Sequence, residues 1–524
     1  MSPSHGKGTA EALTVVPYSI ASLKRFLARK TKLRVVQAKL HSLYFENYFK
    51  RVGAKTIVIE QEYIDRDFLE DFAGYYVRCF PDYERKGSRL HFFDFSFSQN
   101  QFLSVLDGGN RQLVQKLQKG YLGFIVVKPL PETIIGRTCL ATYPEEQNRS
   151  FPITRVYDAN ICGIPLTVKS LAYQEQDRVA AACATSALWS VFHGTGKLYH
   201  HHIPSPVEIT QAANASVSSN SRSLPSQGLT AGQIAAAMRS VGLEPFLVRA
   251  ADEYVLKSTL YAYLRGHVPV LLGIDLYDKE KNAYRFDGKH AVAVTGFRLS
   301  NRKAKPHGAA GFLLRASRTE KIYVHDDQVG PFARMVFDGK TVTVGSDAKL
   351  SLSTSWGERG GKPGEVRAVP DLMLVPLYHK IRIPYAAVHD LVVRFDSVVE
   401  LARAIAASAI LPERMEWDIF LTTVNEFKTE LVARRGLQKS YKRQVLKQSM
   451  PKFLWRATAR TRGTLVFDLL FDATDIEQGD LFVRAVEYDQ IFGKYFHSVC
   501  KEPSLKKFFR DGPELRVIEW FADR

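Results

Sequence analysis

The sequence predicts an α+β protein, and two observations carry this prediction. In the middle of the chain, stretches with helical periodicity come first and β-rich runs follow them, instead of alternating with them. The β-rich runs are short and separated by Gly, Asp and Lys, as is typical of an antiparallel sheet. The chain has 524 residues, 45% of them hydrophobic, which is enough for two to four domains. We expect three domains, over residues 1–150, 151–370 and 371–524.

The expected N-terminal domain opens with a basic helical stretch, Ser22–Arg34. In Thr56–Phe80, a β-branched run then gives way to an acidic stretch with apolar residues at helical spacing. Two short strands follow, interrupted by Pro129 and Pro131. None of these segments carries a catalytic pattern, so we expect a mixed α+β domain with a structural or partner-binding role.

The expected central domain begins with an apolar helix after Cys183 and a polar loop, Asn214–Gly228, which we expect to form one wall of a cleft. Leu229–Pro245 has the pattern of an amphipathic helix closed by Gly242. Four β-rich runs come next: Gly266–Tyr277, His290–Leu299, Ala310–Ser317 and Lys321–Phe337. Helices first and a sheet second, within one segment, are typical of an α+β domain.

The expected C-terminal domain is also α+β. Ser397–Ile410 and Glu416–Gly436 both have helical periodicity, and Thr461–Asp489 is β-like. A cluster of acidic residues in this last segment does not follow the spacing of a calcium-binding loop, so we expect no metal there: Asp472, Asp475, Glu477 and Asp480.

The chain is basic, with 72 Lys and Arg against 54 Asp and Glu and a formal charge of +18. The excess is concentrated in Ser22–Arg34 and Ala433–Arg462. Neither segment has a helix-turn-helix, zinc-finger or RNP pattern. Charge runs are most often solvated faces, and the partners that such surfaces attract are acidic proteins and nucleic acids.

The cysteines indicate a reducing compartment, because they are scattered, without a CxxC pair or the spacing of zinc ligands: Cys79, Cys139, Cys162, Cys183 and Cys500. The first residues lack the pattern of a signal peptide, and no apolar run approaches the ~18 residues that a membrane span requires. We therefore expect a cytosolic protein that does not associate with membranes.

Cys183 is a candidate nucleophile because it stands at the start of an alanine-rich helix, in the stretch "QEQDRVAAACATSALW". The dipole and the first-turn N–H groups of a helix favour a thiolate, and we expect Asp177 to be the acidic residue or cap at this helix end. A free cysteine is more commonly a buried apolar residue, so Cys183 alone is weak evidence.

Two downstream motifs strengthen the case for Cys183. His290 opens an apolar strand in "KHAVAVTGF", and 36 residues later "IYVHDDQVG" ends a second apolar strand in two aspartates. A nucleophile on a helix, a base on one strand and a carboxylate on the next form a Cys-His-Asp arrangement. Strand alternation favours Asp326 as the carboxylate, because it places Asp326 on the same face as the apolar side chains of Ile322 and Val324.

These motifs resemble the papain-like cysteine peptidase superfamily, most closely the bacterial branch that includes bacteriocin-leader peptidases. That branch has Gln…Asp-Cys-Gly-x-Ala, with about six positions from the glutamine to the cysteine, then His-x-Val-x-Val-x-Gly and a strand ending in Asp-Pro-x-x-Gly. This chain has "ACATSA" around Cys183, "HAVAVTG" at 290–296 and "DDQVG" at 326–330. The resemblance covers about residues 170–340.

The resemblance implies a papain-like central domain, with a nucleophile helix packed on an antiparallel sheet and α+β domains on either side. It implies Cys183 as nucleophile, His290 as general base and acid, and Asp326 as the residue that orients the imidazole. It further implies Gln176 as an oxyanion-hole donor, together with the Cys183 backbone N–H. Where the family has Asp-Cys-Gly, this chain has Ala-Cys-Ala.

Two of these roles, the oxyanion donor and the orienting carboxylate, each have a second candidate residue. Gln176 stands seven residues before the cysteine and Gln174 nine, so both are candidates for the oxyanion donor. Asp327 occupies the position of the family's proline, which makes it an alternative to Asp326.

The implied function is that of a cytosolic cysteine peptidase or isopeptidase, which forms an acyl-enzyme on a protein or peptide substrate and needs no cofactor or metal. Acyl transfer by the same residues is one alternative. A catalytically decayed papain-like adaptor, which binds nucleic acid or an acidic protein through its basic surfaces, is another.

Other histidines have simpler interpretations. His200, His201 and His202 are consecutive, which spreads their side chains too widely for one metal ion, so we expect a polar turn. His193 and His325 flank the expected site, and we expect them to be supporting or surface residues.

Overall fold

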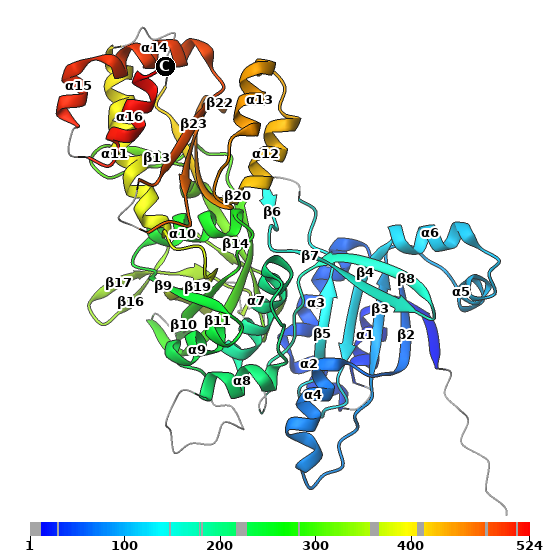
Figure 1. Ribbon diagram of the computed structural model, residues 1–524. Helices are drawn as coiled ribbons and strands as arrows, with labels where there is room; N and C mark the ends of the chain where they lie inside the picture. Colours follow the sequence, from blue (N-terminus) through cyan, green and yellow to red (C-terminus); the bar gives the residue numbers. More distant parts are fainter. Residues whose placement is uncertain are drawn as a thin grey trace, which may run out of the picture. The chain divides into compact units, whose positions relative to one another are not determined.

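The computed structural model describes residues 12–28, 31–145, 148–177, 179, 182–215, 228–280, 283–356, 366–405, 413–476, 480–509 and 512–524. Helices and strands occur together throughout, which confirms the α+β class (Figure 1). The chain packs into two compact units. The first comprises Met1–Arg249, Pro269–Phe297 and Lys321–Pro376, and the second comprises Ala250–Val268, Arg298–Glu320 and Leu377–Arg524.

These units do not follow the three ranges expected from the sequence. The first unit takes in the range 1–150 together with most of 151–370, whereas two segments of the middle range, Ala250–Val268 and Arg298–Glu320, belong to the second unit. Which ranges fold alone is not decided by packing, so the division into three domains stays a prediction.

The first unit begins with a five-stranded antiparallel sheet in the order β1-β2-β3-β4-β5. Its strands are β1 (Leu13–Pro17), β2 (Thr56–Tyr63), β3 (Gly87–Phe93), β4 (Tyr121–Val127) and β5 (Ile135–Leu140). The helices of this part are α1 (Ile20–Leu27), α2 (Leu33–Ala38), α3 (Leu40–Val52), α4 (Arg66–Gly74), η1 (Tyr76–Arg78), α5 (Gln99–Leu106) and α6 (Arg111–Lys119). The expected basic helices, the β2 to α4 transition and the two strands around the prolines are all present.

A hairpin and three helices follow. The hairpin is β7 (Arg155–Ile161) and β8 (Ile164–Ser170), and β8 alternates strictly between buried and exposed residues because one of its faces meets the core. The helices are α7 (Cys183–Tyr199), α8 (Pro206–Asn214) and α9 (Ala231–Ser240). Capping boxes start α8 and α9, with Ser205 and Thr230 as the caps, and a left-handed Gly242 follows α9 as expected.

The second sheet of this unit closes on itself. Its path is β10-β11-β14-β15-β18-β19, and an additional pairing between β10 and β19 joins the two ends. The strands of this path are β10 (Val270–Glu280), β11 (Ala283–Leu299), β14 (Thr319–Asp326), β15 (Gly330–Val336), β18 (Leu352–Ser353) and β19 (Val366–Tyr378). Also in the unit are β6 (Arg149–Ser150) on β11, β9 (Leu243–Arg249) on β19, and the separate hairpin β16 (Thr341–Val344) and β17 (Asp347–Leu350).

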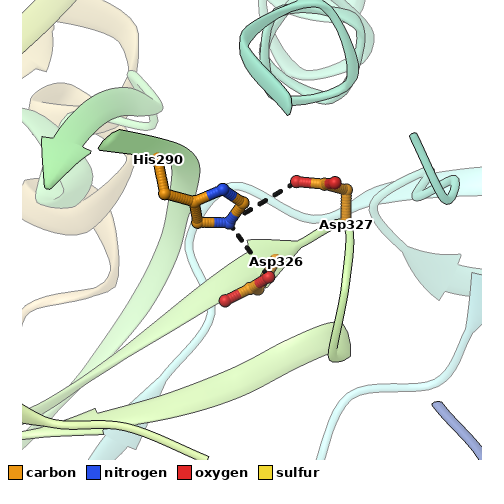
Figure 2. A group of neighbouring side chains, drawn as sticks. All are labelled: His290, Asp326 and Asp327. Atoms are coloured by element: carbon orange, nitrogen blue, oxygen red, sulfur yellow. Dashed lines mark hydrogen bonds and ion pairs between the residues drawn. The ribbon is translucent and has the colours of Figure 1, made fainter. Parts of the chain in front are cut away.

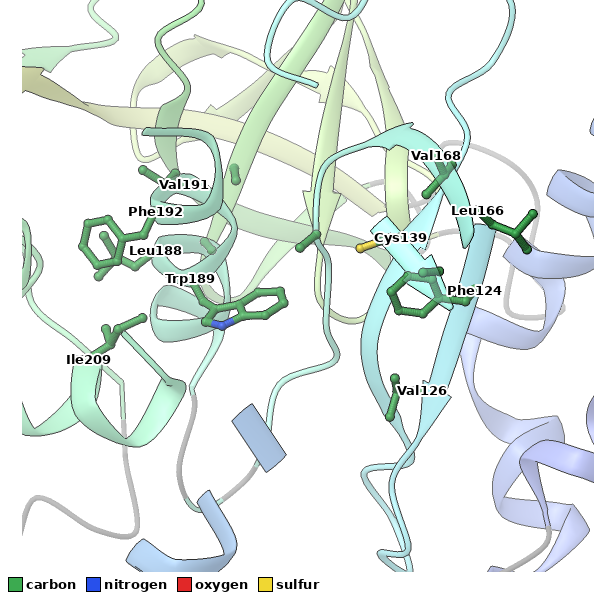
Figure 3. Close-up of a cluster of buried hydrophobic side chains, with 14 of the residues drawn as sticks. Phe124, Val126, Cys139, Leu166, Val168, Leu188, Trp189, Val191, Phe192 and Ile209 are labelled. Carbon is green, nitrogen blue, oxygen red and sulfur yellow. The ribbon is translucent and has the colours of Figure 1, made fainter. Parts of the chain in front are cut away.

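One apolar cluster ties these parts of the first unit together. It extends from Phe124 in β4 and Leu166 in β8 to Leu188 and Trp189 in α7 (Figure 3). Because α7 is surrounded by this core, residues on all of its sides are buried instead of those on one stripe. The core therefore fixes the start of α7, where Cys183 stands.

The second unit is built on a six-stranded sheet, β12-β13-β20-β21-β22-β23. Its strands are β12 (Pro306–His307), β13 (Phe312–Leu314), β20 (Glu416–Thr423), β21 (Phe453–Thr461), β22 (Thr464–Asp472) and β23 (Phe482–Glu487). Its helices are α10 (Glu253–Arg265), η2 (Arg315–Arg318), α11 (Tyr385–Ile405), α12 (Val424–Ala433), α13 (Lys439–Lys447), α14 (Gln490–Lys501), α15 (Pro503–Phe508) and α16 (Leu515–Ala522).

The expectation of a helix over all of Glu416–Gly436 is wrong for its first half. Glu416–Thr423 is the strand β20, which pairs with β13 on one edge and with β21 on the other. Its residues are buried on both faces of the sheet. An apolar run that is buried on both faces has no period of two, so its pattern alone does not distinguish a strand from a helix. The helix starts after Thr423, which caps α12 in a capping box.

Within the described residues, no helix combines the length and the apolar character needed to cross a membrane.

Candidate active site

Cys183 is the first residue of α7 and is partly exposed, whereas every residue from Ala184 to Gly196 is buried. The N-cap, Ala182, has no side chain that can accept a hydrogen bond from the first turn. The N–H groups of a first turn have no acceptor within the helix, and together with the dipole they favour an anion at this end. The position thus suits a reactive thiolate.

The expectation that Asp177 caps this helix is wrong. Its carboxylate accepts hydrogen bonds from the Tyr76 hydroxyl at 2.7 and 2.8 Å and from the Val179 N–H at 2.9 Å, and it is buried. Six positions separate Asp177 from Cys183, which is too far for a cap.

His290 lies in the middle of β11, opposite Ile274 of β10. The expectation that the histidine opens this strand is wrong. The strand begins at Ala283, since residues before His290 already pair with β10. His290 is 5% exposed, it lines the same cavity as Cys183, and the neighbouring Cys183 thiol helps to raise its pKa. Helix α7 and strand β11 therefore bring the proposed nucleophile and base together.

Asp326 ends β14 and holds the other side of the imidazole. Its Oδ1 accepts a hydrogen bond from His290 Nε2 at 3.1 Å (Figure 2) and another from the Gln328 N–H at 3.1 Å. Its Oδ2 accepts a 2.7 Å hydrogen bond from Trp356 Nε1. Since Nε2 faces the carboxylate, Nδ1 is the nitrogen left for the thiol. The structure thus places Cys183, His290 and Asp326 in the order needed for a triad.

The charges of the two aspartates control the state of the imidazole. Burial alone lowers the pKa of His290, but Asp326, Asp327 and the hydrogen bonds with Asp326 and Cys183 outweigh it and hold this pKa well above its ordinary value. Burial likewise acts to raise the pKa of Asp326, yet His290, Trp356 and the Gln328 N–H outweigh it and keep this pKa below its ordinary value. The site therefore holds an imidazolium against a carboxylate.

Asp327 also reaches the imidazole, with its Oδ1 3.6 Å from His290 Nε2. Burial, with Asp326 adding to it, raises the pKa of Asp327 to about 7 in spite of the imidazolium. Strand alternation does not separate the two aspartates, because the register shifts after Val324 and both side chains are buried. The shorter distance and the larger set of donors favour Asp326 as the orienting carboxylate.

Gln176 lines the cavity that contains Cys183 and His290, and Gln174 is not among the residues that line it. Gln174 is 4% exposed, and its side-chain nitrogen has no hydrogen-bond partner among the described residues. Of the two glutamines, Gln176 is therefore the one placed to reach a bound carbonyl group.

The cavity beside Cys183 and His290 has a volume of about 900 Å³. Its apolar wall is made by α9, β10 and β19, and its polar part includes an ion pair of 3.6 Å between Lys289 and Asp275. The apolar side chains are those of Leu229, Ile234, Leu271, Leu372 and Leu374. Most of the polar loop expected as a cleft wall, residues 216–227, lies outside the described residues, although Gly228 lines the cavity.

Sequence patterns gave no indication that the first 150 residues support the site. His41 in α3 bonds to the Tyr173 hydroxyl at 2.7 Å, and that hydroxyl donates to the backbone oxygen of Asp327 at 3.0 Å. The hydroxyl of Tyr44, also in α3, donates to the backbone oxygen of Pro331. The Tyr44 ring lies so close to Gly330 that a Cβ atom at this position would be 2.4 Å from it. Helix α3 thus packs behind the turn that carries both aspartates.

Trp356 is a second contributor that sequence patterns missed. Besides its hydrogen bond to Asp326, its ring lies 5.2 Å from the imidazole of His290 at 76°. A tryptophan in the polar, glycine-rich context "STSWGERGG" is the one sequence signal that marks it.

The remaining histidines lie in structural positions. His193 and His325 are buried, and burial lowers the pKa of both, to about 3 for His325. His200 ends α7 in the left-handed conformation, and irregular backbone continues through His201 and His202. This agrees with the expected polar turn.

The acidic residues expected not to bind a metal stabilise turns, because their carboxylates accept hydrogen bonds from nearby backbone N–H groups. Asp472 Oδ1 accepts from the Thr474 N–H at 2.6 Å, and Asp480 Oδ1 accepts from the Phe482 N–H at 3.1 Å. Glu477 lies outside the described residues.

His290, Asp326 and Asp327 offer three ligand-type atoms within 4.8 Å of one another. Metal ligation requires a neutral imidazole, whereas the two carboxylates here raise the pKa of His290 and favour the imidazolium. The same two carboxylates keep the imidazole protonated, which suits it to proton transfer.

No protein-family model matches the chain, and a search of curated proteins found no match either.

Proposed function

We propose that this chain is a papain-like thiol hydrolase, a cysteine peptidase or isopeptidase. The observation that carries the proposal is that Cys183 and His290 line one cavity of about 900 Å³, while the imidazole of His290 bonds to Asp326 at 3.1 Å. A nucleophile at a helix start, ahead of an antiparallel sheet that supplies the base and the carboxylate, also fits a papain-like central domain.

The proposed reaction starts with His290 as the imidazolium, which has taken the proton of Cys183. The sulfur attacks the carbonyl carbon of an amide, and the oxyanion is held by the Cys183 N–H and by Gln176. The imidazolium then gives its proton to the leaving amine, and an acyl-enzyme remains. His290 next deprotonates a water molecule, whose oxygen attacks the acyl carbon. The C–S bond then breaks, the carboxylic acid leaves, and the proton held by His290 returns to the sulfur.

The cavity supports a peptide as the substrate. Its apolar wall offers burial for a side chain, and Asp371 and Asp275 line it beside this wall. All five cysteines are free, which fits a protein of the reducing cytosol.

The proposal is tested by the rate at which iodoacetamide alkylates each cysteine at pH 6. We expect Cys183 to react at least tenfold faster than Cys162, which is exposed but whose pKa is raised by burial and by Glu60. Mass spectrometry of the digested protein separates the two sites, and Cys183→Ala should abolish both the fast phase and peptide hydrolysis. Preferential labelling of Cys79 or Cys139, or equal rates at Cys183 and Cys162, would refute the assignment.

A further inference from the structure

Asp327 is a buried carboxylate that the proposed Cys-His-Asp chemistry does not use. It is 3% exposed, and its Oδ1 lies 3.6 Å from the same imidazole nitrogen that bonds to Asp326. Figure 2 shows this nitrogen of His290 between the two carboxylates. A single N–H donates one good hydrogen bond, so the second carboxylate is not required to orient the ring.

The two aspartates are supported very unequally. Both oxygens of Asp326 accept hydrogen bonds, from His290, the Gln328 N–H and Trp356. Neither side-chain oxygen of Asp327 accepts a hydrogen bond from any residue that the structure describes. Leaving a buried acceptor without a donor destabilises the folded state, more so when the acceptor is charged. A carboxylate kept in such a place calls for a function.

The other groups around Asp327 do not balance its charge. Glu175 is itself acidic and is already paired with Lys39. Burial lowers the pKa of His41, so this side chain is neutral, and Tyr173 donates to the backbone oxygen of Asp327 and not to its carboxylate. The imidazolium of His290 is therefore the positive charge that faces Asp327.

We propose that Asp327 is a positioning residue that acts through His290. Its carboxylate places a second negative charge beside the imidazolium and keeps His290 protonated to higher pH than Asp326 alone would. This inference rests on the proposed function. The pKa of Asp327 is about 7, so its carboxyl group is fully charged at pH values well above 7. At these pH values His290 would otherwise lose its proton, and the charge of Asp327 opposes that loss.

The direct test is the pKa of the His290 imidazole, measured by NMR on the full chain with ¹⁵N-labelled histidine and assigned by the loss of its signal in His290→Gln. We expect Asp327→Asn to lower this pKa by at least one unit, a tenfold change in proton affinity. The matched control is Asp71→Asn, another buried aspartate of the first unit, whose carboxylate accepts from the Val207 N–H. Equal values in the wild type, Asp71→Asn and Asp327→Asn would overturn the proposal.

A second readout is the alkylation of Cys183 by iodoacetate, whose negative charge makes its reaction depend on the imidazolium. The alkaline limb of its pH profile should move to lower pH in Asp327→Asn by the same amount. If Cys183 shows no enhanced reactivity in any variant, the proposed function fails, while the imidazole titration still decides the effect of Asp327 on His290. If Asp327→Asn does not fold, the wild-type His290 signal should show a second inflection near pH 7, and its absence would overturn the inference.

Discussion

The indole N–H of Trp356 donates a 2.7 Å hydrogen bond to Oδ2 of Asp326, the oxygen that His290 does not use. The carboxylate is thereby held from both ends, and the tryptophan ring also contacts the imidazole edge-on. A residue far from Cys183 in sequence thus fixes the acid–base pair in place.

Trp356→Phe should test this support, because it keeps an aromatic ring and removes the N–H. We expect unfolding free energy at pH 7 to fall by about 1–3 kcal/mol, the cost of leaving a buried charged acceptor short of a donor. The pKa of Asp326 is lowered in the folded state, so its stabilisation is present above the ordinary carboxyl pKa and is lost as the pH falls through the lowered value. The variant should therefore lose less stability than the wild type as the pH falls through this range, so that the difference between the two, measured by urea unfolding, narrows in acid. Identical midpoints would contradict this role.

Asp326→Asn should reduce peptide hydrolysis by about 10²–10⁴-fold, because an amide neither orients the imidazole as well nor stabilises its charged form. Turnover is compared with that of Asp71→Asn, in which a buried aspartate away from the imidazole is changed in the same way. Loss of activity in both variants to the same extent would indicate a general effect on folding.

Gln176→Ala should lower kcat by about 10–10³-fold with a smaller change in KM, as expected for the loss of an oxyanion donor. Gln174→Ala is the control, since that side chain is buried and does not line the cavity. A larger loss of kcat in Gln174→Ala would reverse the assignment of the two glutamines.

Asp327→Asn should make the protein more stable at pH 8 and change its stability little at pH 4. The pKa of Asp327 is raised to about 7, so wild-type stability falls as the pH rises from the ordinary carboxyl pKa to about 7 and stays lower above it. An amide avoids this cost, which we expect to be on the order of 1–3 kcal/mol. Denaturant unfolding at the two pH values measures the difference, and a variant that is less stable at pH 8 would show that the carboxylate is structural.

Asp468→Ala should destabilise the second unit by about 3–5 kcal/mol, because it leaves the buried Arg456 with only the largely exposed carboxylate of Glu430 as a partner. Asp468 accepts from Arg456 Nε at 3.0 Å, Thr458 Oγ1 at 2.6 Å and the Tyr488 hydroxyl at 2.6 Å. Thermal unfolding followed by calorimetry should show a lower Tm for this unit, and Asp468→Asn should lose less because an amide oxygen still accepts. Equal Tm values would argue against a stabilising network.

Much of the fold near the site followed from local patterns. The helix after Cys183, the helix ending before Gly242 and the apolar strand carrying His290 are set by propensity, caps and β-branched runs, which act over a few residues. The hydrogen bond from His290 goes to Asp326, the aspartate that the sequence favoured over Asp327. The reason given for it, that alternate residues of the strand face the core, does not apply, because β14 is buried on both faces at its end.

What the patterns missed depends on long-range packing. Trp356 meets Asp326 across 30 positions of sequence, and His41 reaches Tyr173 across 132. Neither contact leaves a local periodicity. The strand Glu416–Thr423 was mistaken for helix for a related reason, since its partners on both sides come from other segments of the chain.

The contacts of α3 have a consequence for modularity. His41 and Tyr44 pack against Tyr173 and the turn at Gly330, and the residues that carry Cys183, His290 and Asp326 belong to the same compact unit as the N-terminal sheet. A chimaera that keeps Cys183, His290 and Asp326 but replaces α3 would preserve the reactive groups and lose the surface that holds their aspartate turn rigid.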